Sequence, residues 1–186
     1  MKKAILGAVL LAALCSAATA AKVEGWILSG ARANSYEIGE DTGEGKTKKI
    51  PRFIRYTSGD SSSFGTLMQQ ISAKNYAGKR VRFQALVKTR DVNLWAGLWM
   101  SALRPGDDRP AAFYNSYDKR ITGTTDWQQR SVTLDIPENA ATLNFGVINS
   151  GRGQVWIDEL SLEVVGKEVP VDVMPGHSVP AETPTL

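Results

Sequence analysis

The sequence has a single cysteine, Cys15, and a single histidine, His177. Disulfide frameworks, Cys/His zinc sites and catalytic triads with a histidine base need more of these residues, or need them inside a folded core. His177 instead stands in a stretch with prolines at positions 170, 175, 180 and 184. The sequence therefore argues against thiol chemistry, a histidine triad and a histidine-based metal site.

Long apolar runs are also scarce, and the clearest one is at the start of the chain. Two lysines precede the run Ala4–Leu14 and the small-x-small triplet Ala18–Ala20 follows it, a pattern typical of a secretory signal peptide. The run is shorter than the ~20 apolar residues that a membrane-spanning helix needs. We therefore expect residues 1–20 to be removed on export to the periplasm or the medium. The alternative is a lipoprotein signal that acylates Cys15, although Leu14 stands where a small residue is normal.

Neither sign of charge dominates the chain that remains after cleavage. The signal segment holds two lysines and no acidic residue, so the formal net charge falls from +3 to +1. Arg80, Arg82, Lys88 and Arg90 make a modest basic strand face of the kind that usually faces solvent. With export, this balance predicts no nucleic-acid partner. Cys15 also leaves with the signal, so the stability of the mature chain must come from one hydrophobic core.

Catalytic carboxylate pairs are poorly placed in this sequence. Asp158 and Glu159 are neighbours on an expected strand, so their side chains point to opposite faces, and Asp107-Asp108 lies in an expected loop. The segment Gly43-x-Gly45-Lys46 lacks the spacing of a phosphate-binding loop. These patterns predict a protein that is not an enzyme.

Alternating apolar and polar residues dominate the rest of the chain, which indicates β-strands rather than helices. The stretch Gly123–Val165 reads as three consecutive antiparallel strands, and we expect them to form a meander with turns at Pro137–Asn139 and Ser150–Gly153. The expected apolar faces of the three strands are Val132, Leu134 and Ile136; Leu143, Phe145 and Val147; and Trp156, Leu160, Leu162 and Val164.

Upstream and downstream segments complete the expected domain. A first strand followed by a loop is predicted at residues 22–36, and a polar, glycine-rich connection at 37–49. Further strands are predicted at 50–57, 64–71, 80–88, 93–103 and 111–117. About eight strands without a long helix favour an all-β jelly-roll β-sandwich of two antiparallel sheets, over residues 21–166. The proline-rich residues 167–186 lack large aromatic side chains, so we expect a disordered tail.

Three stretches carry a resemblance: GTTDW at Gly123–Trp127, LDIPENA at Leu134–Ala140 and GQVWIDELSLE at Gly153–Glu163. They resemble galactose-binding-like jelly rolls, including several families of carbohydrate-binding modules. FGTLMQQI, NYAGKRVRF and NLWAGLWM upstream fit the same pattern. The chain is similar in particular to a bacterial domain of poorly defined role that occurs alone or fused to enzymes and regulators, and the similarity covers about residues 23–170. It implies a single sandwich with a non-catalytic, ligand-binding or spacer function.

The strand Asn93–Ser101 carries the main candidate ligand site. Alternation places Leu94, Ala96, Leu98 and Met100 in the core and turns Trp95 and Trp99 outward, with Gly97 leaving space between the two rings. Residues four apart on a strand lie roughly 13 Å from each other, which suits stacking on non-adjacent sugars of a glycan. Polar partners are expected from the next strand and its loop, namely Tyr114 or Asn115, Tyr117 and Arg120. Alternatively, the 37–49 connection covers both tryptophans, or they belong to the core.

Asp158 is the second candidate, because it stands on the apolar side of its strand, where an unpaired carboxylate is costly. In carbohydrate-binding jelly rolls similar to this chain, an acidic residue of the last strand helps to hold a structural calcium ion. The resemblance therefore implies a calcium site at Asp158, with Glu24, Glu37 or Asp41 as co-ligands. Alternatively, Asp158 is bonded to backbone N–H groups or to an arginine.

These observations predict an exported binding module for a carbohydrate or another small polar ligand, with no required cofactor. The rival expectation is a structural or protein-interaction domain of the cell envelope. In that case the surface tryptophans would be buried against the chain's own loop or against an envelope protein.

Overall fold

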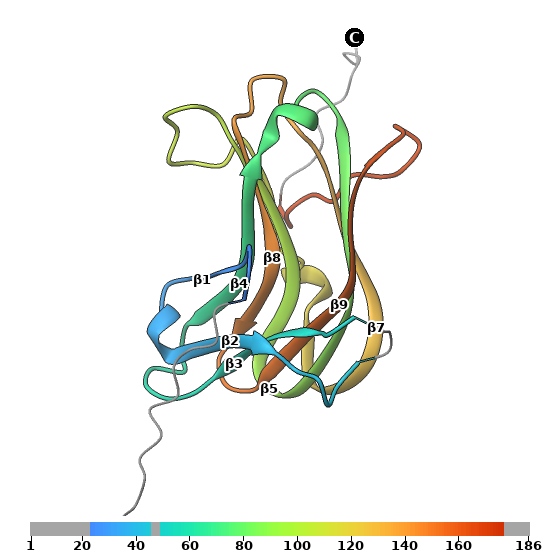
Figure 1. Cartoon of the computed structure of the whole chain (residues 1–186). Helices are drawn as coiled ribbons and strands as arrows, with labels where there is room; N and C mark the ends of the chain where they lie inside the picture. Colours follow the sequence, from blue (N-terminus) through green and yellow to red (C-terminus); the bar gives the residue numbers. More distant parts are fainter. Residues whose placement is uncertain (1–22, 46–48, 177–186) are drawn as a thin grey trace, which may run out of the picture.

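The computed structural model describes residues 23–45 and 49–176, and it contains nine strands that form a β-sandwich (Figure 1). The expected signal peptide with Cys15, and His177, lie outside the described residues. The described ranges contain no helix long and apolar enough to cross a membrane. The strands are β1 (Ile27–Ser29), β2 (Tyr36–Glu40), β3 (Arg52–Tyr56), β4 (Phe64–Ser72), β5 (Arg80–Leu103), β6 (Ala112–Tyr114), β7 (Ile121–Asp135), β8 (Thr142–Ser150) and β9 (Gln154–Val165).

The long strand β5 belongs to both sheets of the sandwich. Its first half, Arg80–Arg90, pairs with β7 on one side and β9 on the other, whereas Trp95–Leu103 pairs with β8 and, near its end, β6. The β9 sheet therefore has the order β7-β5-β9-β3-β2 and the β8 sheet the order β1-β4-β8-β5-β6. The sequence predicts two separate strands here. The chain instead continues through Asp91, whose positive φ of 55° and the bulges around it turn β5 from one sheet into the other.

The predicted meander is wrong, although its three strands are present. β7 pairs with β5, β8 lies between β4 and β5, and β9 lies between β3 and β5, so none of the three pairs with the next. The chain crosses between sheets at each connection, as jelly-roll topology requires. At the second crossing Gly153 has a φ of 107°, and a Cβ there would lie 2.6 Å from the Asp91 carbonyl oxygen. The glycine thus allows the connection between the two sheets to pass close to the Asp91 backbone, and it does not belong to a hairpin turn.

One continuous core fills the space between the two sheets. Alternation places Val81, Phe83 and Val87 of β5 inward, opposite Leu98 and Met100 of the same strand, and all five are buried. Leu94 was predicted to join them but is 42% exposed. It stands beside the turn between the sheets, where the alternation of β5 is interrupted.

A bulge in β9 changes which of its residues face the core. Glu159 has a φ of 49°, and the pairing of β9 with β5 shifts register at this point. Before the bulge, Val155 and Ile157 join the core, and after it Leu160 and Leu162 pack against the core. The predicted common face of Trp156, Leu160, Leu162 and Val164 is therefore wrong. Val164 is 51% exposed, at the far end of the strand.

The segment 37–49 contains a strand and covers a tryptophan, but not the ones suggested by the sequence. β2 occupies its start, and Asp41 accepts a hydrogen bond of 2.9 Å from the indole N–H of Trp156. Lys88 and Arg90 lie over the same indole, with Lys88 also paired to Glu44. Trp156 is thus buried on the outer face of the β9 sheet under polar and charged groups.

The first part of the expected disordered tail is held against the sandwich. Arg80 donates hydrogen bonds of 2.6 Å to the carbonyls of Lys167 and Val169, and Asp172 exchanges hydrogen bonds with the backbone of Thr133 on β7. Met174 packs against the core. Residues 167–176 therefore differ from the prediction because an edge strand offers them unpaired backbone groups. Residues 177–186 lie outside the described residues.

The ion pair that anchors this segment predicts a pH effect on stability. Arg80 binds both carboxylate oxygens of Asp135, at 2.8 and 2.9 Å, and holds the pKa of Asp135 below its ordinary value. A lowered carboxylate pKa contributes stability above the unfolded value of about 3.9, and that contribution is lost as the pH falls through the folded value. We expect Asp135→Asn to lower the free energy of unfolding at pH 6 by less than ~1 kcal/mol, since the Asp135 carboxylate is mostly exposed.

Urea denaturation at pH 6 and pH 3 measures this difference. The gap between the wild type and Asp135→Asn should shrink at pH 3. A gap that is equal or larger at pH 3 contradicts the expected contribution of the ion pair.

Candidate functional site

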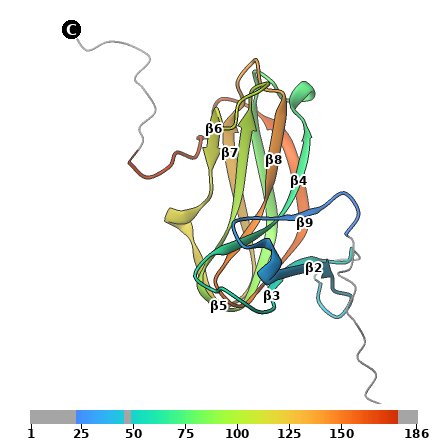
Figure 2. The same cartoon turned by 90° about the vertical axis from the view of Figure 1, so that its left-hand side faces the viewer.

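The outer face of the β8 sheet carries a pocket of about 290 Å³ that contains both predicted tryptophans. Figure 2 shows β6, β8 and β4 of this sheet on the face turned toward the viewer. We call the hollow the aromatic pocket. It is lined by Ser29, Gly30, Phe64, Thr66, Met68, Trp95, Trp99, Phe113, Asn115 and Ile148.

Strand register explains why these side chains meet. Trp95, Gly97 and Trp99 alternate with the buried Ala96 and Leu98, so they face outward. Phe113 of β6 stands opposite Ser101, which has the same outward direction. The pattern of β5 predicted the two tryptophans, and the alternation Phe113–Tyr114–Asn115 carries the signal for Phe113, which the sequence analysis missed.

Trp99 lies across the neighbouring strand. Its indole N–H donates a hydrogen bond of 2.7 Å to the hydroxyl of Thr66 on β4, although β8 runs between β4 and β5. The β8 residue opposite both Trp99 and Met68 is Gly146, which has no side chain to block this path. Because adjacent strands are roughly 4.8 Å apart, the ring must extend over β8 to reach Thr66. Trp99 is therefore a fixed, half-buried platform on the sheet surface.

Trp95 forms the second wall of the pocket together with the loop after β6. The Tyr117 ring meets it edge-on at 5.4 Å between ring centroids, and the Arg120 guanidinium stacks on Tyr117 at 5.2 Å. Tyr117 belongs to the 3-10 turn η3 (Tyr117–Lys119) and is 47% exposed. The structure thus brings Tyr117 and Arg120 next to Trp95, although neither of them lines the pocket.

The space expected above Gly97 is filled. A Cβ at Gly97 would lie 3.1 Å from Ser116 Cβ, 3.4 Å from the Asn115 carbonyl oxygen and 3.5 Å from Trp95. The Asn115–Ser116 step therefore packs onto the strand between the two tryptophans. The rings border one compact pocket instead of two separate stacking positions.

Asn115 and Tyr114 lie on opposite sides of the sheet. Asn115 lines the aromatic pocket, and its side-chain oxygen accepts a hydrogen bond from the Tyr117 N–H at 3.2 Å. Tyr114 is 1% exposed, pairs with the core residue Met100, and donates from its hydroxyl to Asp118. Burial, together with the acceptor Asp118, raises the pKa of Tyr114. Tyr114 is therefore a core residue, and its prediction as a ligand residue was wrong.

A row of polar side chains continues the same outer face. Gln70 of β4 donates to Asn144 of β8 at 3.0 Å, and Asn144 donates to Ser101 of β5 at 3.3 Å. Ser101 is also opposite Phe113, so this row, which we call the amide row, begins beside the aromatic pocket. Hydrogen-bonding groups of this kind match hydroxyl-rich ligands.

The described residues do not assemble the predicted calcium site. They contain no group of three or more Asp, Glu, His or Cys side chains placed to hold a metal ion. Asp158 is 2% exposed, and one of its oxygens accepts the Glu159 N–H at 2.8 Å. Glu24 is exposed, Glu37 pairs with Arg55, and Asp41 binds the Trp156 indole. The three residues expected as calcium co-ligands are therefore either exposed or bound to another side chain.

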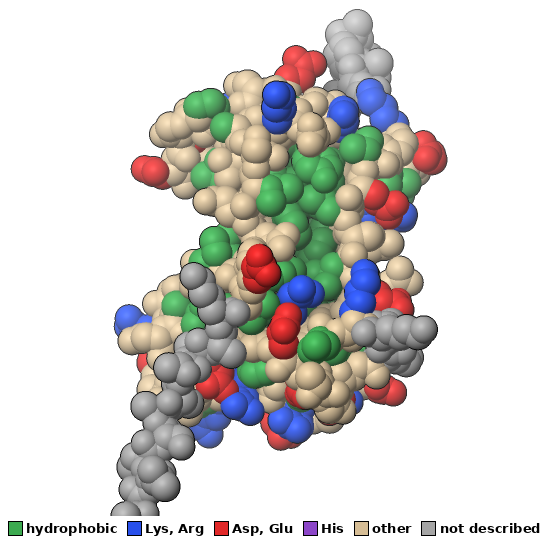
Figure 3. Space-filling model, viewed as in Figure 1, with side chains coloured by type: hydrophobic (Ala, Val, Ile, Leu, Met, Phe, Trp, Pro, Cys, Tyr) green, Lys and Arg blue, Asp and Glu red, His purple; other side chains and the backbone are tan. Residues whose placement is uncertain are grey.

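A second hollow opens between the two sheets on the side drawn in Figure 3. Figure 3 shows hydrophobic side chains on its floor and charged ones near its lower end. It includes Phe83, Phe145, Leu160 and Leu162, which belong to the core or pack against it, and the Arg52 guanidinium lies 5.6 Å from the Trp26 ring. This hollow is an open edge of the core, and the rings that line it, Trp26, Phe83 and Phe145, are all buried residues.

Comparison with known proteins first identifies the architecture. A family 22 carbohydrate-binding module from the C-terminal part of Clostridium thermocellum Xyn10B superposes with a TM-score of 0.55 and 13% identity, over 80% of this chain and 91% of that one. The fold is the jelly roll of carbohydrate-binding modules. The CBM22-1–GH10 modules of the same bacterium's endo-1,4-beta-D-xylanase 10B, complexed with xylohexaose, superpose with a TM-score of 0.56 and 14% identity, over 80% of this chain and 28% of that one.

Sequence comparison gives a different relative. The chain is 40% identical over 150 residues to the uncharacterized HTH-type transcriptional regulator YbfP of Bacillus subtilis (strain 168). The match covers 80% of this chain, and the chain spans about half the length of that relative. No protein-family model matches the chain. The chain is therefore similar in sequence to a part of a larger regulator, and similar in structure to carbohydrate-binding modules.

Proposed function

We propose that this chain is a non-catalytic carbohydrate-binding module and that the aromatic pocket is its ligand site. The observation that carries the proposal is the meeting of Trp95, Trp99 and Phe113 in one outward-facing pocket. The apolar C–H face of a sugar ring stacks on an aromatic surface, while its hydroxyls need polar partners. Asn115 of the pocket lining and Gln70, the exposed member of the amide row, supply such partners.

The lining of the pocket favours binding over catalysis. None of its residues titrates near neutral pH, and its hydroxyl groups, on Ser29 and Thr66, have no histidine or carboxylate beside them in the lining. General acid–base chemistry and glycoside hydrolysis both need such groups at the ligand. The pocket volume of about 290 Å³ is at the lower end of the usual ligand range, so we expect it to enclose a short part of a glycan.

The comparisons support the same assignment. Several structural neighbours are named as carbohydrate-binding modules, and a chain that joins such a module to a GH10 module is described as complexed with xylohexaose. The relative named as a transcriptional regulator is consistent with a recognition domain that is used in more than one kind of chain. Residues 1–20 have the pattern of a signal peptide, and we therefore place the binding step outside the cytoplasm, in the periplasm or the medium.

The competing candidate is a structural or protein-interaction domain of the cell envelope. Its supporting observation is Phe113, which is 39% exposed and widens the apolar surface around the pocket. Exposed apolar patches also bind proteins. The first candidate predicts that a glycan binds in the pocket without any protein partner, and the second predicts that it does not.

A glycan array that includes xylan, other plant polysaccharides and bacterial envelope polysaccharides tests the proposal on residues 21–186. We expect selective binding to one glycan class and a loss of roughly tenfold in Phe113→Ala, which removes an exposed ring without opening the core. The control is Trp127→Ala on β7, a half-buried indole outside the aromatic pocket. Equal binding by Phe113→Ala and the wild type, or no binding to any glycan, contradicts the assignment.

A further inference from the structure

Arg130 is an arginine at a core-facing position of β7. It stands opposite Ala85, which is 1% exposed, and two residues further Val132 stands opposite the buried Phe83. The alternation Arg130, Val132, Leu134 would therefore place an apolar residue at position 130. The small Ala85 leaves room between the sheets for the longer side chain.

The guanidinium of Arg130 has no partner in the part of the chain that the structure describes. Its Nε is fully buried and makes no hydrogen bond, and no carboxylate lies within ion-pair distance in residues 23–45 and 49–176. A partly buried cation without an anion is unfavourable, because burial removes water that no protein group replaces. Such a group costs stability unless something else binds it.

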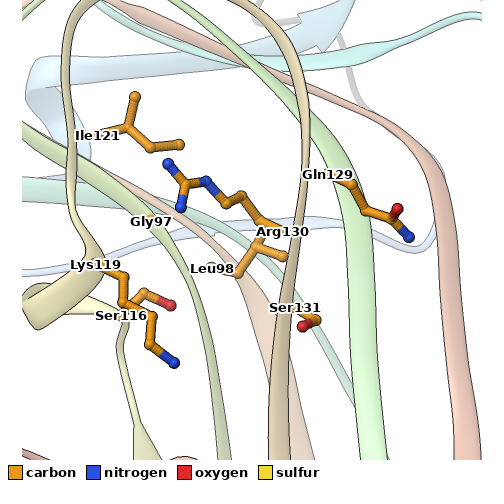
Figure 4. A pocket seen from close by; sticks show the side chains of 8 residues that line it. All are labelled: Gly97, Leu98, Ser116, Lys119, Ile121, Gln129, Arg130 and Ser131. Atoms are coloured by element: carbon orange, nitrogen blue, oxygen red, sulfur yellow. The ribbon is translucent and has the colours of Figure 1, made fainter.

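Arg130 points into a small pocket of about 180 Å³ between β5, β7 and η3, which we call the arginine pocket. Figure 4 shows the guanidinium reaching toward Gly97 and Ile121, while the ends of Lys119 and Gln129 point elsewhere. Lys119 is already paired with Asp172 at 2.6 Å, and Gln129 donates to Gln84. The lining contains the hydroxyls of Ser116 and Ser131 and no carboxylate.

The loop beside this pocket is held in an unfavourable backbone conformation. Ser116 has a φ of 56°, in the left-handed region, and is 7% exposed. Non-glycine residues in this region carry strain that the surrounding structure must hold. Ser116 packs on Gly97, which also contacts Trp95, so the arginine pocket and the aromatic pocket are separated by the Asn115–Ser116 step.

We propose that the arginine pocket is a subsite for a carboxylate group, held by Arg130 with help from the Ser116 hydroxyl. A planar carboxylate matches the two-pronged donor geometry of a guanidinium, and the volume of about 180 Å³ limits the group to small size. The carboxylate can come from a uronic acid unit of a glycan or from a free small acid. The subsite does not depend on sugar binding in the aromatic pocket.

The test compares galacturonic acid with galactose, which differ in the carboxylate, and includes acetate as a free acid. Binding is followed by protein NMR titration and by the shift in melting temperature, with the wild type, Arg130→Met and the control Arg109→Met in the exposed 104–110 loop. We expect galacturonic acid to bind the wild type and Arg109→Met at least tenfold more tightly than galactose. Arg130→Met should lose this preference.

A second readout separates binding from a structural role. Without ligand, Arg130→Met should melt at the same or a higher temperature than the wild type, since the change removes an unpaired charge and keeps an apolar stem of similar length. Acetate binding that also needs Arg130 identifies free acids as ligands, and binding of galacturonic acid alone identifies uronic acids. Equal binding of galacturonic acid and galactose, or unchanged carboxylate binding in Arg130→Met, overturns the proposal.

Discussion

The double variant Trp95→Ala/Trp99→Ala is expected to bind its glycan roughly 100-fold more weakly than the wild type, a loss of about 2.7 kcal/mol in binding free energy. Both rings line the aromatic pocket, and they supply most of its flat apolar surface together with Phe113. Binding energy concentrates in such aromatic anchors at the centre of a site. Isothermal titration with the glycan selected by the array measures the loss.

Two further variants make this result specific. Trp99→Phe keeps a ring over β8 but removes the N–H that Thr66 accepts, so we expect it to retain more binding than the double variant. Trp127→Ala should bind as the wild type does, because Trp127 lies outside the pocket. If the double variant stays folded and binds within threefold of the wild type, the aromatic pocket is not the ligand site.

The second large effect concerns stability. We expect Gly146→Ala to lower the free energy of unfolding by about 3 kcal/mol, or roughly 10 °C in melting temperature. A Cβ at this position would clash with the Leu67 carbonyl oxygen and lie 2.7 Å from Met68 Cα. Because β8 is held between β4 and β5, neither neighbour can withdraw without breaking its ladder of hydrogen bonds.

Gly43→Ala is the matched control for this variant. An added Cβ there meets only the Asp41 side chain, at an ordinary 3.5 Å, so its effect should stay within about 0.5 kcal/mol. Urea denaturation of both variants and the wild type provides the comparison. A Gly146→Ala protein within 1 kcal/mol of the wild type shows that β4 and β8 can move apart at low cost, contrary to the close approach in this structure.

The sequence was most informative where alternation was undisturbed. In the second half of β5, the regular pattern from Trp95 to Ser101 correctly identified the inward and outward residues, and hence the two tryptophans of the pocket. The jelly-roll class followed from the same kind of pattern in the other strands and agrees with the structural neighbours. Alternation alone assigns faces because side chains on a strand have a period of two.

The errors occurred where a single residue broke that period. Leu94 lies next to the passage of β5 between sheets, and the bulge at Glu159 separates Trp156 from Leu160, so parity counted across these points placed Leu94 and Trp156 incorrectly. A positive φ could not be predicted for Glu159, since glutamate rarely adopts it, and Asp91 tolerates such a φ without requiring it. The order of β7, β8 and β9 was also missed, because turn residues look alike in a hairpin and in a crossing between sheets.

Arg130 illustrates a signal that was present in the sequence but not used. A charged residue in phase with Val132 and Leu134 marks a place where a strand deviates from simple core packing. Only the structure adds that the guanidinium lacks a partner in the described residues and points into the arginine pocket. The pattern locates the residue, and the packing of Asn115–Ser116 against Gly97 forms one side of the site.

The most direct test of the account is an NMR titration that follows the five tryptophan indole N–H signals while the selected glycan is added. The account predicts that the signals of Trp95 and Trp99 shift together and saturate, while those of Trp26, Trp127 and the covered Trp156 stay in place. Shifts confined to Trp26, Trp127 or Trp156 would show that the glycan binds elsewhere on the sandwich. That result would contradict the assignment of the aromatic pocket as the carbohydrate site.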